Sequence, residues 1–150
     1  MVAHPPCTYL TVTGNRWFNE TVYGGNALTR YRDRVDGIQF FMNFVYCNAK
    51  SVAIENPVGI MSGVYRKPDQ VVQPYEYGDP SRKATCLWLR NLPLLQPTDI
   101  VEPEIVTYTR GDGRKVTFTA DYGVGFNTEH GKRRSKTYPG VAKAMSEQWG

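Results

Sequence analysis

The stretch ALTRYRDRVDGIQFFMNFVYCNAKSVAIENP (residues 27–57) predicts a long amphipathic helix followed by a buried strand. Within residues 27–46, apolar side chains recur at steps of three and four residues, whereas charged side chains mostly occupy the other positions. The apolar positions are Leu28, Tyr31, Val35, Ile38, Phe41, Met42 and Val45. Residues 51–55 are a short apolar run, which Asn56 and Pro57 are expected to end. A helix that leads into a buried strand is typical of an α/β sheet.

The residues on both sides of this stretch predict further strands and a second helix. Residues 1–4 indicate the end of a strand, because Pro5 and Pro6 cannot donate to a strand ladder. RGDGR (residues 110–114) predicts a tight hairpin turn, since Asp-Gly suits a turn with positive φ. We expect loops at 8–26 and 58–83, strands at 84–89, 104–108 and 115–119, and a helix at 139–149. The chain is therefore predicted to be a single domain, residues 1–150, in which part of an α/β sheet carries an added β-hairpin insertion at 102–131 and a short C-terminal helix.

The composition favours one folded domain. The 150 residues are 41% hydrophobic and 21% charged, and a formal charge of +4 suits a polyanionic partner without requiring one. No CxxC pair occurs among three cysteines, which excludes a zinc ribbon and favours a reduced, cytoplasmic protein. Cys47 and Cys86 are expected to be buried small hydrophobes. The longest apolar run, IQFFMNFVY, is too short to cross a bilayer, and the first residues lack a signal-peptide pattern, so we expect a soluble protein with no membrane partner.

Two polar motifs directly follow predicted strands. His4-Pro-Pro-Cys7 follows the first strand, and Glu55-Asn56-Pro57 closes the strand at 51–55. Open α/β sheets bind their ligands at the carboxyl ends of strands, so the two motifs are expected to share one site. Each motif also has a purely structural interpretation, as a turn with a buried thiol and as a solvated carboxylate. His4 and Cys7 do not predict a metal site, because no further ligand pattern accompanies them.

The order of the motifs resembles the cytosine-5 DNA methyltransferases. PPC is followed about fifty residues later by ENP, and then by GDPSRKATCLWL. The longer pattern of HPPCTYLT, AIENPVG, PDQVVQPYEYGDPSRKATCLWLRNLP and YPGVAKAMSEQW is similar to a phage and prophage branch of that family. The resemblance covers nearly the whole chain except residues 102–131. It implies a partial Rossmann-like, methyltransferase-type sheet, DNA as the partner and, for a phage protein, the cytoplasm of the host cell.

The resemblance further implies methyl transfer from S-adenosylmethionine to cytosine C5 in DNA. Cytosine C5 is too weak a nucleophile to accept that methyl group unaided. A thiolate that adds to C6 makes C5 carbanion-like, and a protonated carboxyl at N3 stabilises the charge. By this resemblance Cys7 is the nucleophile and Glu55 the N3 partner, and the target base is flipped out of the duplex. Pro5, Pro6 and Asn56 would brace the two motifs.

Two basic groups extend the implied site. Arg82 and Lys83 fall where the family carries a pair of arginines near the base, although SRKAT departs from the usual Gln-x-Arg-x-Arg pattern. A second basic run is a candidate for contact with the DNA backbone: Lys132, Arg133, Arg134 and Lys136. Both groups also fit a solvated surface.

The donor-binding motifs of the family have no counterpart ahead of Cys7. In the family a glycine-rich loop and an acidic residue precede the Pro-Cys loop, and YGVGF (residues 122–126) is better interpreted as a glycine-rich turn. We therefore do not expect this chain to bind S-adenosylmethionine by itself. Three interpretations stay open: a fragment or split enzyme completed by another chain or a second copy, a catalytically dead relative that binds DNA or protein (for example against a host defence), and an unrelated α/β binding module. A sheet without its first strands exposes an edge, so we expect a second copy, a partner or the hairpin to cover it.

Overall fold

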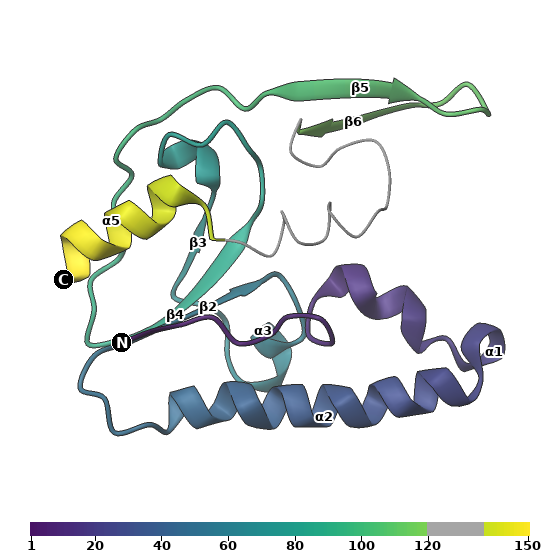
Figure 1. Ribbon diagram of the computed structural model, residues 1–150, viewed down its shortest axis with the longest axis horizontal. Coiled ribbons are helices and arrows are strands. Elements are labelled where there is room, and N and C mark those ends of the chain that lie inside the picture. Colours follow the sequence, from purple (N-terminus) through teal and green to yellow (C-terminus); the bar gives the residue numbers. More distant parts are fainter. Residues whose placement is uncertain (120–136) are drawn as a thin grey trace. The chain divides into compact units, whose positions relative to one another are not determined.

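The computed structural model describes residues 1–119 and 137–150, which form a mixed α/β structure with two sheets (Figure 1). The chain divides into two compact units, Met1–Val72 with Ala84–Leu94 and Gln73–Lys83 with Leu95–Gly150. The first unit contains β1 (Val2–Ala3), η1 (Val12–Phe18), α1 (Glu20–Tyr23), α2 (Gly25–Val45), β2 (Val52–Pro57), α3 (Met61–Val64), β3 (Gln70–Val72) and β4 (Thr85–Arg90). The second contains η2 (Pro74–Glu76), β5 (Ile105–Thr109), β6 (Lys115–Thr119) and α5 (Pro139–Trp149). The α/β class is confirmed, and the folding of both units as one domain stays a prediction.

The first unit is built on a four-stranded sheet of order β1-β2-β4-β3. β1 runs parallel to β2, whereas β4 is antiparallel to both of its neighbours, β2 and β3. A parallel pair cannot be joined by a tight turn, and here the connection between β1 and β2 contains η1, α1 and the long helix α2. The helix predicted at 27–46 is therefore confirmed, and it serves as the crossover of a β-α-β unit.

One apolar cluster joins α2 to the sheet. Alternation along β2 turns Val52 and Ile54 to the same face, and the register places Trp88 of β4 opposite Ile54. Phe41 of α2 packs edge-on against Trp88, with the ring centroids 5.2 Å apart. The indole N–H of Trp88 is satisfied by the carbonyl of Arg66 at 2.8 Å. The buried members of the cluster are Leu10, Phe41, Val52, Ile54, Met61, Cys86 and Trp88.

The N-terminal half of α2 departs from the expected core. The periodicity assigns Leu28, Tyr31 and Val35 to the buried face, but all three are exposed. The strands β2 and β4 have six residues each, or about 20 Å, whereas the 21 residues of α2 span roughly 30 Å. The helix is therefore longer than the sheet it packs on, and it is the second half of α2 that meets the apolar cluster.

Several short elements were not expected from the sequence. Residues 8–26 contain η1 and α1, and residues 58–83 contain α3, β3 and η2, where loops were predicted. Elements of three to seven residues span too few periods to be recognised from spacing alone. β2 also continues through Asn56 and Pro57 instead of ending before them, because Pro57 occupies the last position of the strand, where a missing N–H is tolerated.

The second unit confirms the predicted hairpin and C-terminal helix. β5 pairs antiparallel with β6, and Gly113 in the turn between them has a φ of 82°. α5 begins at Pro139 and ends at Trp149, as the sequence predicts. Gly140 lies directly against the Tyr77 carbonyl, where a Cβ atom would overlap, and its N–H donates to the Asp79 carboxylate at 2.9 Å. These contacts fix the start of α5 on residues 77–79.

We predict that Phe41→Ala lowers the free energy of unfolding by about 3–5 kcal/mol, because it leaves a cavity beside Trp88. Phe41 is 0% exposed, whereas its neighbour Phe40 is 46% exposed. The matched control Phe40→Ala should therefore cost about 1 kcal/mol or less. Chemical denaturation followed by tryptophan fluorescence measures both values, and equal losses at the two positions would contradict the packing of α2 described here.

Candidate functional site

The parallel pairing of β1 with β2 brings the two polar motifs together. The register pairs Ala3 with Ile54. Neighbouring residues on paired parallel strands advance together, so His4 lies beside Glu55 directly after this pair. The two motifs are separated by about fifty residues in the sequence, yet they are neighbours at the same end of the sheet.

Two side-chain contacts join the motifs. Nδ1 of His4 lies 2.9 Å from Oε2 of Glu55, and the two side chains are 41% and 16% exposed. Asn56 is 1% exposed, and its amide donates from Nδ2 to the Pro5 carbonyl at 2.8 Å. Among the described residues, the buried Oδ1 of Asn56 has no hydrogen-bond partner. Asn56 thus donates its amide hydrogen bond to the first proline of the Pro-Pro-Cys loop, and its bracing role in a methyltransferase site stays a prediction.

The thiol of Cys7 stands at a tight turn that begins after the two prolines. Pro5 is buried and Pro6 is exposed. The carbonyl of Cys7 accepts the N–H groups of Leu10 at 3.0 Å and Thr11 at 3.1 Å. Leu10 is fully buried in the apolar cluster, so the turn is anchored from within, while the Cys7 side chain stays half-buried.

The segment after Cys7 is joined to the loop after β2. Leu10 accepts the Ile60 N–H at 2.9 Å, and Val12 donates to the Val58 carbonyl at 3.2 Å. Gly59 lies between these bonds, and a Cβ atom there would overlap the Leu10 carbonyl oxygen. The two loops can approach this closely only because residue 59 has no side chain.

The Arg34 side chain of α2 also contacts the segment that follows Cys7. Nε of Arg34 donates to the Tyr9 carbonyl and Nη2 donates to Oδ1 of Asn15, both at 2.8 Å. The Arg34 guanidinium also lies 3.4 Å from the centre of the Phe18 ring, a cation–π contact. Burial lowers the pKa of Arg34 below its usual value. A hydrogen bond to Asp33 raises the pKa of the Tyr9 hydroxyl.

The three cysteines have different surroundings. Burial, and then the negative charge of Glu55, raise the pKa of the Cys86 thiol, so this group stays protonated. The predicted burial of Cys86 is confirmed. The prediction that Cys47 is buried is wrong: it is half-buried after the end of α2, where the Arg90 guanidinium lies 3.5 Å from its sulfur. Cys7 is half-buried in the Pro-Pro-Cys loop.

The remaining predicted site residues belong to the second unit or lie outside the described residues. Arg82 is exposed and Lys83 is half-buried, with its ammonium 5.5 Å from the centre of the Tyr138 ring, and both belong to the second unit. Their contact with a substrate stays a prediction. Four basic candidates and the YGVGF segment lie outside the described residues: Lys132, Arg133, Arg134, Lys136 and residues 122–126.

An exposed aromatic group on the first unit was missed by the sequence reasoning. Trp17 is 39% exposed, with the Arg16 guanidinium 4.6 Å above its ring and the Tyr23 ring 5.0 Å away. The adjacent Arg-Trp pair was a visible signal, but its exposure depends on which way η1 turns. Phe18, next in sequence, points inward and is buried.

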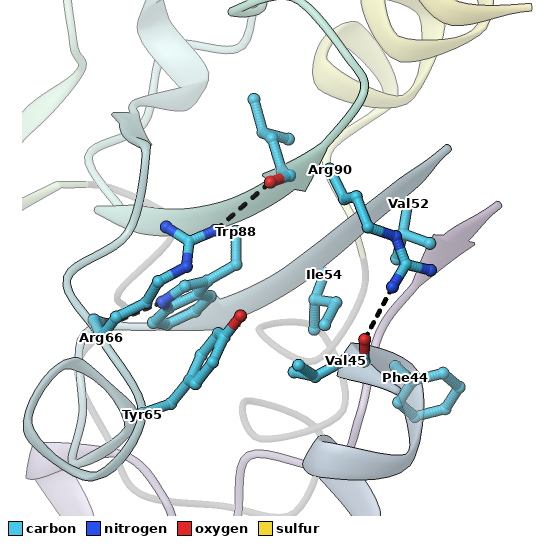
Figure 2. A pocket seen from close by; sticks show the side chains of 9 residues that line it. Phe44, Val45, Val52, Ile54, Tyr65, Arg66, Trp88 and Arg90 are labelled. Atoms are coloured by element: carbon cyan, nitrogen blue, oxygen red, sulfur yellow. Dashed lines mark hydrogen bonds between the residues drawn. The ribbon is translucent and has the colours of Figure 1, made fainter. Parts of the chain in front are cut away.

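A small cavity of about 40 Å³ lies on the face of the sheet covered by α2 (Figure 2). Phe44, Tyr65 and Trp88 supply aromatic walls, and Arg66 and Arg90 supply its charges. Both guanidinium groups are already engaged by protein oxygens. Arg66 donates to the Asp69 carboxylate and the Leu89 carbonyl. Arg90 donates to the carbonyl of Val45, the last residue of α2, and to the carbonyls of Cys47 and Ala49 after it. The cavity has room for a water or two, far below the volume of a cofactor pocket.

The described residues contain neither a metal-binding group nor a membrane span. No three His, Cys, Asp or Glu side chains in that part of the chain gather closely enough to hold a metal ion. None of the helices described combines the length and the apolar composition that crossing a membrane requires. No protein-family model, curated protein or solved structure matches the chain.

We predict that Gly59→Ala loosens the Cys7 loop. The added methyl group overlaps the Leu10 carbonyl oxygen, and relieving this overlap should lower the free energy of unfolding by about 1–3 kcal/mol. Alkylation of Cys7 by iodoacetamide, measured by peptide mass spectrometry, should become faster. The control is Gly63→Ala in α3, where a Cβ atom meets nothing within 4 Å. If both variants match the unmodified chain, the close approach of the two loops is wrong.

We also predict that Asn56→Ala lowers the free energy of unfolding by about 1–3 kcal/mol, because it leaves the Pro5 carbonyl buried without its donor. Thermal denaturation measures the loss. The control is Asn48→Ala, an exposed asparagine for which we expect a change within about 0.5 kcal/mol. A loss at position 56 no larger than at position 48 would show that the amide does not brace the loop.

Proposed function

We propose that this chain is a phage DNA cytosine-5 methyltransferase-like protein that performs the thiol and carboxyl half of the reaction. The observation that carries the proposal is the Asn56–Pro5 hydrogen bond, together with the contact between His4 and Glu55. These contacts hold the Pro-Pro-Cys loop and the Glu-Asn-Pro strand end side by side. The proposed reaction requires this neighbourhood, because one pyrimidine ring must reach both the sulfur and the carboxyl group.

The fold of the first unit supports a partial Rossmann-like, methyltransferase-type sheet. β1, α2 and β2 form a β-α-β unit with parallel strands, which is the building block of such sheets. Both motifs lie at the carboxyl ends of these parallel strands, where open α/β sheets bind ligands. The antiparallel strands β4 and β3 extend the sheet on the far side of β2.

The proposed chemistry uses a cytosine that has been turned out of the duplex. The Cys7 thiolate forms a bond to C6, and the displaced electron pairs move through C5 and C4 to N3, which takes a proton from the Glu55 carboxyl. C5 thereby becomes an electron-rich enamine carbon that can accept a methyl group. Without a methyl donor, the sulfur–carbon bond breaks, the electron pairs return, and N3 gives its proton back to Glu55. Cys86 does not compete, since its thiol is held in the protonated form.

The cavity beside Trp88 is not suited to S-adenosylmethionine. The cavity beside Trp88 is too small for it, and both charges in the cavity wall are cationic arginines, which would repel a sulfonium group. In the reaction implied by the resemblance this compound supplies the methyl group. We propose that the donor is held by another chain or by a second copy, and we derive no step through it.

We predict that DNA carrying 2-pyrimidinone in place of a cytosine forms a covalent adduct with Cys7. This base lacks the 4-amino group, so its C6 is electrophilic enough to add a thiolate without a methyl donor. The adduct should survive denaturing electrophoresis, and peptide mass spectrometry should locate it on Cys7. Cys7→Ser should abolish it, whereas the matched control Cys47→Ser, which removes a thiol of similar exposure, should leave it intact.

Failure of the unmodified chain to form this adduct would remove methyl transfer as the function. Repeating the experiment with 5-fluorocytosine DNA and S-adenosylmethionine tests the complete reaction, because the fluorine traps the enzyme only after a methyl group has arrived. A calorimetric titration with the donor alone tests whether this chain binds it, and tight one-to-one binding would contradict the proposed need for a second chain.

The alternative is a catalytically inactive relative that binds DNA or protein, for example against a host defence. The exposed Trp17, flanked by Arg16 and Tyr23, favours it, because an arginine and aromatic rings at the surface suit the stacking of unpaired bases. This alternative is supported if Trp17→Ala abolishes binding of single-stranded DNA in fluorescence anisotropy while neither unmodified chain nor variant forms an adduct.

A further inference from the structure

The contact between His4 and Glu55 has no role in the reaction as the resemblance implies it. Nδ1 of the imidazole lies 2.9 Å from Oε2 of the carboxylate, which is hydrogen-bond distance. Both neighbours of His4 in the chain are fixed: Ala3 pairs with Ile54 in the sheet, and Pro5 accepts the bond from Asn56. The imidazole is therefore held beside the carboxylate by the backbone on both sides.

We propose that His4 is a positioning residue for Glu55: its Nδ1–H donates to Oε2 and thereby leaves Oε1 as the oxygen that meets N3 of the pyrimidine. This inference rests on the proposed function. It explains a side-chain pair that the motifs alone do not require.

The donors and acceptors of the pair decide where its protons lie. An ionised carboxylate only accepts hydrogen bonds, so against it the imidazole must carry a proton on Nδ1. A carboxylic acid has two oxygens, and its proton is useful in the reaction only on the one that faces N3. When Oε2 accepts a hydrogen bond from Nδ1–H of His4, an acid proton on Oε2 could not also point toward Nδ1. The acid proton is therefore carried by Oε1. His4 thus selects the productive form of Glu55.

The surroundings of the pair keep the carboxylate in place. The Glu55 side chain is mostly buried, which limits its rotamers. The thiol of Cys86 is close enough for the charge of Glu55 to raise its pKa, and it is neutral. Holding the reacting oxygen in one orientation saves the entropy that a freely turning side chain would lose in the transition state.

Three substitutions at position 4 test the inference through the rate of adduct formation with saturating 2-pyrimidinone DNA. The amide nitrogen of asparagine is bonded to Cγ, in the same position as Nδ1 of histidine. The amide nitrogen of glutamine is one bond farther from the backbone. His4→Ala and His4→Gln should slow the reaction roughly ten- to a hundredfold, the usual worth of a hydrogen bond to a charged group. His4→Asn should restore most of the rate, and the affinity for the DNA should be unchanged in all three.

The imidazole itself reports the pair without any substrate. The chain has two histidines, so His4→Asn assigns their nitrogen-15 signals. In the unmodified chain at neutral pH we expect the proton of His4 on Nδ1. In Glu55→Ala the ring should return to the form protonated on Nε2 that free neutral imidazoles prefer. A proton on Nε2 in the unmodified chain would overturn the inference.

The two proposals fail in distinguishable ways. If the unmodified chain forms the adduct and His4→Ala forms it equally fast, the positioning role is overturned and the proposed function stands. The positioning role is also overturned if His4→Asn and His4→Gln form the adduct at the same rate, more slowly than the unmodified chain. That result would show that the position of the N–H donor does not matter. If the unmodified chain forms no adduct, the proposed function falls and the role of His4 in it falls too, even where the nitrogen spectra show the pair.

Discussion

The candidate site depends on the parallel pairing of β1 with β2, to which β1 contributes only two residues. So short a strand makes few ladder hydrogen bonds, and each is worth only about 1 kcal/mol net. Asn56 reinforces the pairing from the protein interior, because its amide donates to the Pro5 carbonyl just beyond the strand. The position of Cys7 therefore follows from a strand end, a tight turn and one buried amide.

The long helix α2 supports this arrangement in two ways along its length. Its second half packs on the sheet through Phe41 and thereby stabilises β2, which carries Glu55. Its first half is not covered by the sheet, but Arg34 there binds the backbone of the segment that follows Cys7. One rigid element thus holds both the carboxyl and the thiol side of the site, and rigid support of this kind is what a reaction between two fixed groups needs.

The elements that sequence reasoning recovered are those with strong local signals. α2 repeats its apolar pattern over about five turns, RGDGR specifies a tight turn, and Pro139 suits the first position of a helix. β3 and η1 lack such signals, because a strand of three residues or a single 3₁₀ segment is stabilised by its neighbours and not by its own pattern. The wrong burial of Leu28 has the same origin: periodicity identifies an apolar face, but the length of the sheet beneath it is a property of the whole fold.

The sequence by itself determined which chemical groups are present and in what order they occur: a thiol after two prolines, and a carboxylate before Asn-Pro. Only the tertiary structure decided that His4 contacts Glu55 and that Asn56 binds the Pro5 carbonyl. It also decided that residue 59 must lack a side chain, because it lies against the Leu10 carbonyl. Each of these contacts joins residues about fifty positions apart, and the first two depend on the register between β1 and β2. A shift of that register by one residue would turn Glu55 to the opposite face of the sheet, and local sequence patterns do not report register.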